Sequence, residues 1–115
     1  MASDCLFCNI AKGEIDSEIV HEDELCLAFR DIRPQAPTHL LVIPRKHITG
    51  IAEVEEDDRD VLGHLMLVVA EVARVEGIAE SGYRTVINWG RDGGMEVPHL
   101  HIHVLGGRAM SWPPG

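Results

Sequence analysis

The sequence predicts an α+β fold in which an antiparallel sheet carries helices on one face. Several short apolar segments are separated by short turns, so strands adjacent in sequence are expected to pair antiparallel. One long segment, 58–77, instead repeats apolar residues at helical spacing. The segment 99–105 alternates histidine with aliphatic residues, which is the period-two pattern of a half-buried strand. The expected order is therefore a helix, three strands, a helix and two strands.

The amino-terminal half predicts the short helix and the first three strands. Cys5–Lys12 is apolar every three or four residues and is followed by Gly13, which predicts a short helix. An acidic turn separates the first two strands, and the proline-containing segment 31–37 predicts a loop before the third, which Pro44 closes. The three strands are expected at Glu18–His21, Leu25–Arg30 and His39–Ile43.

The carboxy-terminal half begins with the long helix. Asp57 or Asp58 can cap its start and Gly77 fits its end. Its core-facing stripe is expected to contain Leu62, Leu65, Met66, Val69, Val72 and Ala73. A strand at Tyr83–Trp89, a glycine-rich loop at 90–94 and the histidine strand follow. The proline-rich tail cannot be helical, and its Trp112 is expected to pack on the sheet or on a partner subunit.

Length and composition bound the possible functions. A chain of 115 residues is expected to form one domain, spanning 1–115. Its 19 acidic and 10 basic residues give a net charge of −9, which argues against nonspecific nucleic-acid binding but permits a pocket for one nucleotide. No apolar run reaches the ~18 residues of a membrane span. The first residues lack the pattern of a secretion signal, and three cysteines suggest no disulfide framework, so a cytoplasmic location is expected.

The three alternating histidines, His99, His101 and His103, carry the strongest functional signal. On a strand, all three imidazoles would lie on one face. They could be polar residues facing solvent, a metal-binding face, or a catalytic face in which one imidazole attacks and its neighbours position the substrate. The preceding glycine-rich loop favours the catalytic interpretation, because its backbone N–H groups could hold a phosphate oxyanion.

Cys5 and Cys8 form a Cys-x-x-Cys pair that permits redox chemistry, zinc binding or plain packing as small apolar groups. No βαβ unit of the kind that carries a redox pair is visible. Zinc would need two further ligands. The candidates are His21, His39, His47 and one histidine of the triplet.

The remaining chemically notable residues receive simpler interpretations. Cys26 lies between two leucines in a strand pattern and is expected in the core. His64 is expected on the surface of the long helix, and His21 on the solvent face of its strand.

Several segments together resemble the histidine-triad nucleotide-binding family, and in particular its Hint branch of nucleoside phosphoramidases. The matching stretches extend over essentially the whole chain. They are Phe29–Ile32, Pro34–His39, Leu41–His47, His99–Leu105, Gly106–Arg108 and Trp112–Gly115.

The resemblance implies a five-stranded antiparallel sheet with one long and one short helix, and a homodimer whose two sheets join. It assigns His101 as the nucleophile, His103 and Asn88 as phosphate contacts, and Asp31 as the ribose-binding carboxylate. The implied nucleotide site comprises Phe7, Phe29, Asp31, Ile32, His39, Asn88, Gly94, Met95, Glu96, His101, His103 and Trp112. Zinc-containing members of the wider family carry their ligands at the positions of Cys5, Cys8, His47 and His99.

Three residues before the histidine triplet depart from the family pattern. Met95 stands where a glutamine is common and cannot supply its amide hydrogen bonds. Glu96 stands where serine or glutamate occurs, and Pro98 replaces an aromatic residue and removes a backbone N–H. These three differences are expected to affect the contacts to the leaving group and the reaction rate.

The resemblance implies hydrolysis of the P–N bond of purine nucleoside 5′-phosphoramidates, of the adenosine 5′-monophosphoramidate type, through a phosphohistidine on His101. The first alternative is a non-catalytic nucleotide-binding sensor or scaffold, which Met95 favours. A more remote alternative is a zinc-binding interaction module whose histidines are all used for metal.

Overall fold

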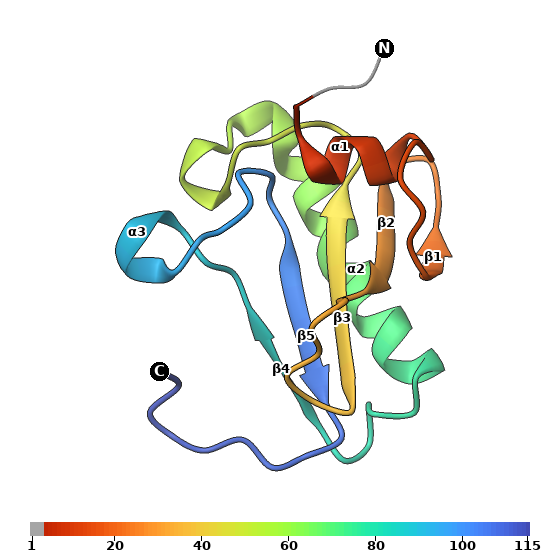
Figure 1. Cartoon of the computed structure of the whole chain (residues 1–115), viewed down its shortest axis with the longest axis vertical. Helices are drawn as coiled ribbons and strands as arrows, with labels where there is room; N and C mark the ends of the chain where they lie inside the picture. Colours follow the sequence, from red (N-terminus) through yellow and green to blue (C-terminus); the bar gives the residue numbers. More distant parts are fainter. Residues whose placement is uncertain (1–3) are drawn as a thin grey trace.

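A computed structural model describes residues 4–115 as a five-stranded antiparallel sheet with helices packed on both of its faces (Figure 1). The strand order is β1-β2-β3-β5-β4, so β1 and β4 form the two edges. The strands are β1 (Ile19–Glu22), β2 (Cys26–Arg30), β3 (Thr38–Pro44), β4 (Tyr83–Val86) and β5 (Ile102–Gly106). The helices are α1 (Leu6–Ala11), α2 (Arg59–Val75) and α3 (Gly90–Gly93), with two 3₁₀ turns, η1 (Ile51–Glu53) and η2 (Glu56–Asp58). The prediction about a secretion signal falls largely on residues 1–3, outside the described residues.

The central strands separate two hydrophobic clusters. Alternate residues of β2 face opposite sides, so Cys26 and Ala28 pack with α2 whereas Leu27 and Phe29 pack with α1. The prediction that the helices share one face of the sheet is therefore wrong. The reason is that β2 and β3 are apolar on both faces, so each face needs its own cover.

Helix α2 ends as predicted but begins differently. Gly77 has a φ of 76°, the left-handed conformation that glycine adopts readily, and its N–H donates to Arg74 O. Asp58 occupies the N-cap position, yet its carboxylate accepts from the N–H of Glu55 and from Lys46 Nζ, and makes no capping bond to α2. It therefore closes the η2 turn.

The buried face of α2 is rotated relative to the predicted stripe. Met66 is 54% exposed, so its place in the stripe was wrong. The residues of α2 that are buried are Val61, Leu65, Val68, Val69, Val72 and Ala73. Leu62 is partly buried against the same cluster.

The strands near the histidine triplet are shorter than predicted. Strand β5 begins at Ile102, paired with Val42, so His99 and His101 precede it. The ladder stops there because Pro44, the last residue of β3, has no N–H to continue it. Strand β4 ends at Val86 rather than at residue 89, and the predicted glycine-rich loop contains the extra helical turn α3.

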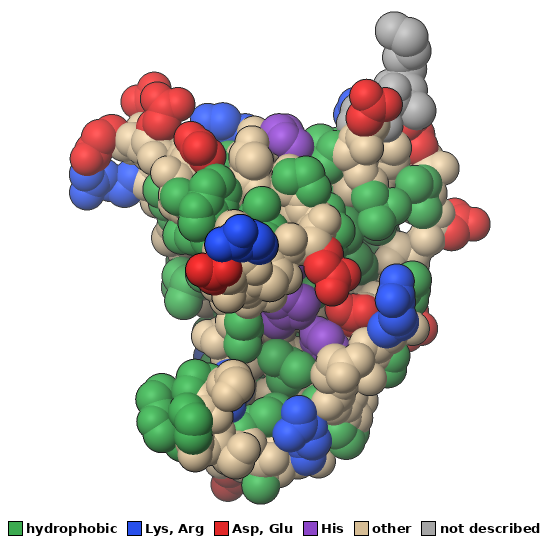
Figure 2. All heavy atoms as spheres, turned by 60° about the vertical axis from the view of Figure 1, so that its left-hand side comes forward, with side chains coloured by type: hydrophobic (Ala, Val, Ile, Leu, Met, Phe, Trp, Pro, Cys, Tyr) green, Lys and Arg blue, Asp and Glu red, His purple; other side chains and the backbone are tan. Residues whose placement is uncertain are grey.

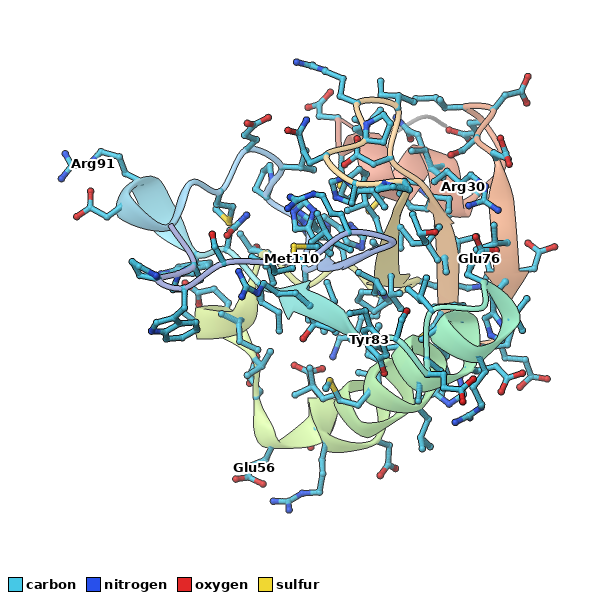
Figure 3. The ribbon with its side chains drawn as sticks, turned by 90° about the horizontal axis from the view of Figure 1, so that it is seen from below. Arg30, Glu56, Glu76, Tyr83, Arg91 and Met110 are labelled. Atoms are coloured by element: carbon cyan, nitrogen blue, oxygen red, sulfur yellow. The ribbon has the colours of Figure 1, made fainter. Side chains whose placement is uncertain are left out.

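Two contacts fasten the periphery to this sheet. Arg30 at the end of β2 and Glu76 just after α2 point toward each other in Figure 3, joined by bonds of 2.7 and 3.1 Å. At the β4 edge, the Arg84 guanidinium donates to the carbonyl of Ser111 and lies 6.0 Å from the Trp112 ring centroid, so Arg84 ties the tail to β4. Within residues 4–115, none of the helices is long and apolar enough to span a bilayer.

Candidate active site and metal centre

A cavity of about 350 Å³ opens on the α1 side of the sheet. Figure 2 shows histidine side chains in a hollow of the surface, with acidic side chains beside them. The lining comes from α1, from the loop after β2, from β3, from the segments on either side of α3, and from β5 and the residue just before it. The lining residues are Leu6, Phe7, Asp31, Ile32, Arg33, Gln35, His39, Leu41, Asn88, Gly94, Glu96, Val97, His101 and His103.

His101 is held in one tautomer by the backbone. Its ring is buried, and Nδ1 lies 2.7 Å from the carbonyl oxygen of His99. A carbonyl only accepts hydrogen bonds, so the neutral ring carries its proton on Nδ1 and has a lone pair on Nε2. The ring of Phe7 meets it edge-on, with 5.1 Å between centroids. His101 thus presents a nucleophilic nitrogen at the cavity wall.

His39 fixes the tautomer of His103 in the same manner. The backbone N–H of Gln35 donates to His39 Nδ1 at 3.0 Å, so the neutral His39 carries its proton on Nε2. That Nε2 lies 2.9 Å from His103 Nδ1, which must therefore accept. His103 consequently carries its own proton on Nε2 and can donate it to an oxyanion. Sheet register brings the two rings together, because His103 pairs with Leu41, two residues from His39.

Burial keeps both of these imidazoles neutral near pH 7. It lowers the pKa of His39, an effect that the Asp31 carboxylate opposes. Burial, aided by His101 and His39, lowers the pKa of His103 to about 4. Asp31 Oδ2 lies 3.5 Å from His39 Nε2, while Asp31 Oδ1 accepts from the N–H of Arg33 and orders the loop.

Nine of the twelve residues predicted for the nucleotide site line this cavity. They are Phe7, Asp31, Ile32, His39, Asn88, Gly94, Glu96, His101 and His103. Phe29 lies behind the wall, where its buried ring contacts Phe7 at 5.5 Å. Met95 turns away, with its sulfur near Gly50. Trp112 is 81% exposed beside Arg84 and does not line the cavity of its own chain.

Sequence reasoning missed five lining residues. They are Leu6, Arg33, Gln35, Leu41 and Val97. Leu41 could have been found, because it is two residues from His39 and so shares its face of the strand. Gln35 contributes through its backbone N–H, for which no side-chain pattern exists.

A second cluster joins α1 to the start of the histidine segment. Donor atoms of Cys5, Cys8, His47 and His99 all lie within 4.8 Å of one another. His99 Nδ1 is 3.2 Å from Cys5 Sγ and 3.5 Å from Cys8 Sγ, and His47 Nδ1 is 3.3 Å from Cys8 Sγ. Of the histidines considered as partners of the cysteine pair, the fold thus brings His47 and His99, and not His21 or His39, into this cluster.

These four residues fit a tetrahedral zinc ion. Two sulfur and two nitrogen donors form a common structural zinc set. His99 Nε2 lies 2.9 Å from the carbonyl of Pro44, so its proton is on Nε2 and the Nδ1 lone pair faces the sulfurs. The cysteines are partly buried and His47 is exposed, which leaves a path for an ion to enter.

The predictions for the other cysteine and histidines were mixed. Cys26 is fully buried, as predicted. His21 and His64 are not free surface residues, because both imidazoles lie 2.7 Å from Asp23 Oδ2. The His64–Asp23 contact joins residues 41 positions apart and has no sequence signature.

Comparisons with known proteins identify the family. A sequence profile of the HIT domain matches residues 12–110. A HIT-like protein of Synechococcus elongatus is 54% identical over 115 residues, covering 100% of both chains. A 14 kDa zinc-binding protein of Zea mays is 53% identical over 115 residues, covering 98% of this chain and 89% of the relative.

A solved structure extends the similarity to the whole fold. The crystal structure of a HIT family hydrolase from Legionella pneumophila superposes with a TM-score of 0.95 at 55% identity, covering 97% of this chain and 100% of the other. The matched range spans the positions of all three histidines of the triplet and of His39. The chain therefore belongs to the HIT domain family.

Proposed function

We propose that this protein is a hydrolase of the Hint type, a phosphoramidase that cleaves the P–N bond of purine nucleoside 5′-phosphoramidates through a phosphohistidine. The observation that carries the proposal is the pair of fixed tautomers in the cavity. The bond from His101 Nδ1 to His99 O leaves Nε2 free to attack, and the His39–His103 bond leaves a proton on His103 Nε2.

The reaction proceeds in two steps at phosphorus. His101 Nε2 attacks, a nitrogen–phosphorus bond forms, and the bond to the leaving amine breaks as the amine takes up a proton. Water then hydrolyses the phosphohistidine and releases a nucleoside monophosphate. The His99 carbonyl stabilises the positive charge that grows on His101, and the His103 N–H binds a phosphoryl oxygen. The backbone N–H groups of Gly94 and Met95 donate to Arg91 O and Gly90 O instead, so the expected phosphate contact through the glycine-rich loop is not available at these two residues.

The other end of the cavity suits a nucleoside. Asp31 is partly buried at the wall and can accept hydrogen bonds from ribose hydroxyls. Phe7 offers an apolar surface, and the side chain of Ile32, 88% exposed at the rim, would gain cover from a bound base. Apolar contact separates bases poorly, so adenosine over guanosine is expected to be a preference only.

We also propose a structural role for zinc. Cys5, Cys8, His47 and His99 would hold the ion and tie α1 to the segment before β5. The zinc-binding relative from Zea mays supports this assignment. Bound zinc would supply a cross-link rather than a reacting group.

Assembly and location complete the proposal. Strand β4 is an edge, and exposed apolar side chains lie on it at Tyr83 and just after it at Ile87 and Trp89, which suits pairing with a second copy. We propose a homodimer of single-domain chains spanning 1–115, located in the cytoplasm. In this dimer Trp112 would approach the partner's cavity.

The deciding experiment is incubation with a fluorogenic adenosine phosphoramidate. The phosphoramidase proposal predicts turnover, with adenosine 5′-phosphate as product, and its loss in His101→Ala. Nucleotide binding without turnover would favour the alternative of a sensor or scaffold. Met95 fits that alternative, because it does not line the cavity and therefore supplies no contact to a leaving group.

A further inference from the structure

A second group of side chains that could bind a metal lies on the α2 side of the sheet, away from the cavity described above. His21 is on β1, Asp23 is in the turn after it, Cys26 begins β2, and His64 is on α2. No sequence pattern connects these four residues, and neither the catalytic proposal nor the zinc proposal above uses them.

Asp23 is held with one carboxylate oxygen directed at the two imidazoles. Its Oδ1 accepts the backbone N–H groups of Leu25 and Cys26, each at 2.8 Å. Its own carbonyl accepts from Arg45 Nε at 2.7 Å. Oδ2 is left to bond His21 Nε2 and His64 Nε2, both at 2.7 Å.

Cys26 adds a sulfur donor to the same place. Donor atoms of Asp23, Cys26 and His64 lie within 4.8 Å of one another. Ligand atoms around a tetrahedral zinc are separated by roughly 3.3–3.8 Å, given bond lengths of about 2.0–2.3 Å. Small side-chain movements would therefore let these three donors bind one ion. His21 could become the fourth ligand, because it already contacts Asp23 Oδ2.

We propose that Asp23, Cys26 and His64, with His21 as fourth donor, form a second site for zinc or a similar divalent transition metal. One sulfur, two nitrogens and one oxygen are donors that zinc accepts. The three polar side chains are partly exposed, so an ion can reach the site from solvent, with the buried Cys26 at its floor.

Metal binding must displace protons here. Burial and the neighbouring Asp23 raise the pKa of the Cys26 thiol to about 12, so the thiol is neutral without metal. Coordination would release the thiol proton to solvent, as metals deprotonate thiols that bind them. The imidazoles would bind through Nε2 and carry their protons on Nδ1. The ion would then bridge the β1–β2 turn to α2.

Cobalt(II) provides a sharp test because the chain has three cysteines, two of them in the first cluster. In a Cys5→Ser/Cys8→Ser variant, any thiolate-to-cobalt charge-transfer absorption must come from Cys26. We expect that absorption to appear at one cobalt per chain. Adding His64→Gln should weaken cobalt binding at least ~10-fold, as loss of metal-site partners does. Adding His47→Gln, which touches only the first cluster, should have no effect.

Two results would overturn the site. One is cobalt binding without the charge-transfer absorption, which would place the ion on other imidazoles. The other is an absorption that His64→Gln leaves unchanged. If the double variant does not fold, metal content answers the question. The unmodified protein should contain two zinc ions per chain, and the His64→Gln single variant should contain one. An equal zinc content in the two proteins would reject the proposal. Neither readout depends on phosphoramidase activity.

Discussion

The carbonyl oxygen of His99 accepts the hydrogen bond that orients the ring of His101. The His99 ring itself lies among Cys5, Cys8 and His47, with its Nε2 bonded to Pro44 O. His99 therefore belongs to the Cys5–Cys8–His47–His99 cluster through its side chain and to the cavity through its backbone. Displacement of the His99 ring would displace the carbonyl that orients His101, the proposed nucleophile.

Loss of metal should accordingly affect both stability and rate. We expect chelation or Cys8→Ser to lower the melting temperature by roughly 4 °C or more, about 1 kcal/mol for a domain of this size. The value of kcat should fall with it, because the His99 ring would then be held only by its bond to Pro44 O, while KM changes less. Metal analysis, calorimetry and steady-state kinetics together test this. Protein that is purified without metal and melts identically with chelator would contradict it.

Removal of the nucleophile should separate chemistry from binding. His101→Ala deletes the attacking nitrogen, so turnover of an adenosine phosphoramidate should fall by about 10³-fold or more. Nucleotide affinity should stay within a few-fold, because Asp31, Phe7 and Ile32 are untouched. Calorimetric titration with adenosine 5′-phosphate measures the second quantity. Residual activity near that of the unmodified protein would assign the attack to another group.

The His39–His103 contact should matter for kcat more than for KM. His39→Phe keeps a ring of similar size but removes the N–H that fixes the His103 tautomer. Leaving His103 Nδ1 without its donor costs about 1–3 kcal/mol. If that cost falls on the transition state, it corresponds to a loss of roughly 5- to 150-fold in kcat. Leu41→Met is a matched control, because it changes the shape of the same cavity wall without removing a hydrogen bond. Equal effects of the two variants would mean that the tautomer has no role.

Acid should destabilise the protein between about pH 6.5 and 4. Burial lowers the pKa of His39 and His103 in the folded state, the latter to about 4, against about 6.5 when unfolded. The unfolded chain therefore binds more protons in this interval, and the free energy of unfolding falls as pH falls. Each lowered pKa unit contributes at most about 1.4 kcal/mol. Urea unfolding at several pH values measures the slope, which should flatten in His39→Phe/His103→Asn. An unchanged slope would assign the protons elsewhere.

The carboxy-terminal tail should shape a partner's site. Sedimentation should give a mass about twice that of one chain if the β4 edges pair. Deletion of residues 109–115 should change kcat or substrate preference more than melting temperature, because Trp112 is exposed and covers no core of its own chain. Wild-type kinetics in the truncated protein, or a monomer at micromolar concentration, would exclude this role.

Local patterns predicted most elements of the fold. Alternation at 99–105 placed β5 approximately, and Gly77 marked the end of α2, because both signals come from single residues and their neighbours. The prediction missed that α1 packs on the face of the sheet opposite α2. That position depends on which face of β2 and β3 the long helix leaves uncovered, and no local pattern records this. Met66 was misplaced for a similar reason, because a helix can rotate by one residue and keep an apolar stripe.

The candidate site was predicted mainly through resemblance, and its hydrogen bonding came only from the structure. The fixed tautomer of His103 depends on the Gln35 N–H and on the register between β3 and β5. Asp23 and His64 are likewise joined across 41 positions. Contacts of this kind arise from chain folding and leave no periodic signal in the sequence.

The sheet separates two hydrophobic clusters, and this has a consequence for how the protein opens. Amides of β3, the middle strand, should exchange with solvent only when the whole molecule unfolds. The loop 31–37 lines the cavity and is mostly exposed, so its amides are expected to exchange at a lower free energy than those of β3. Fluctuations on the cavity side of the sheet therefore need not disturb the packing of α2 on the opposite face.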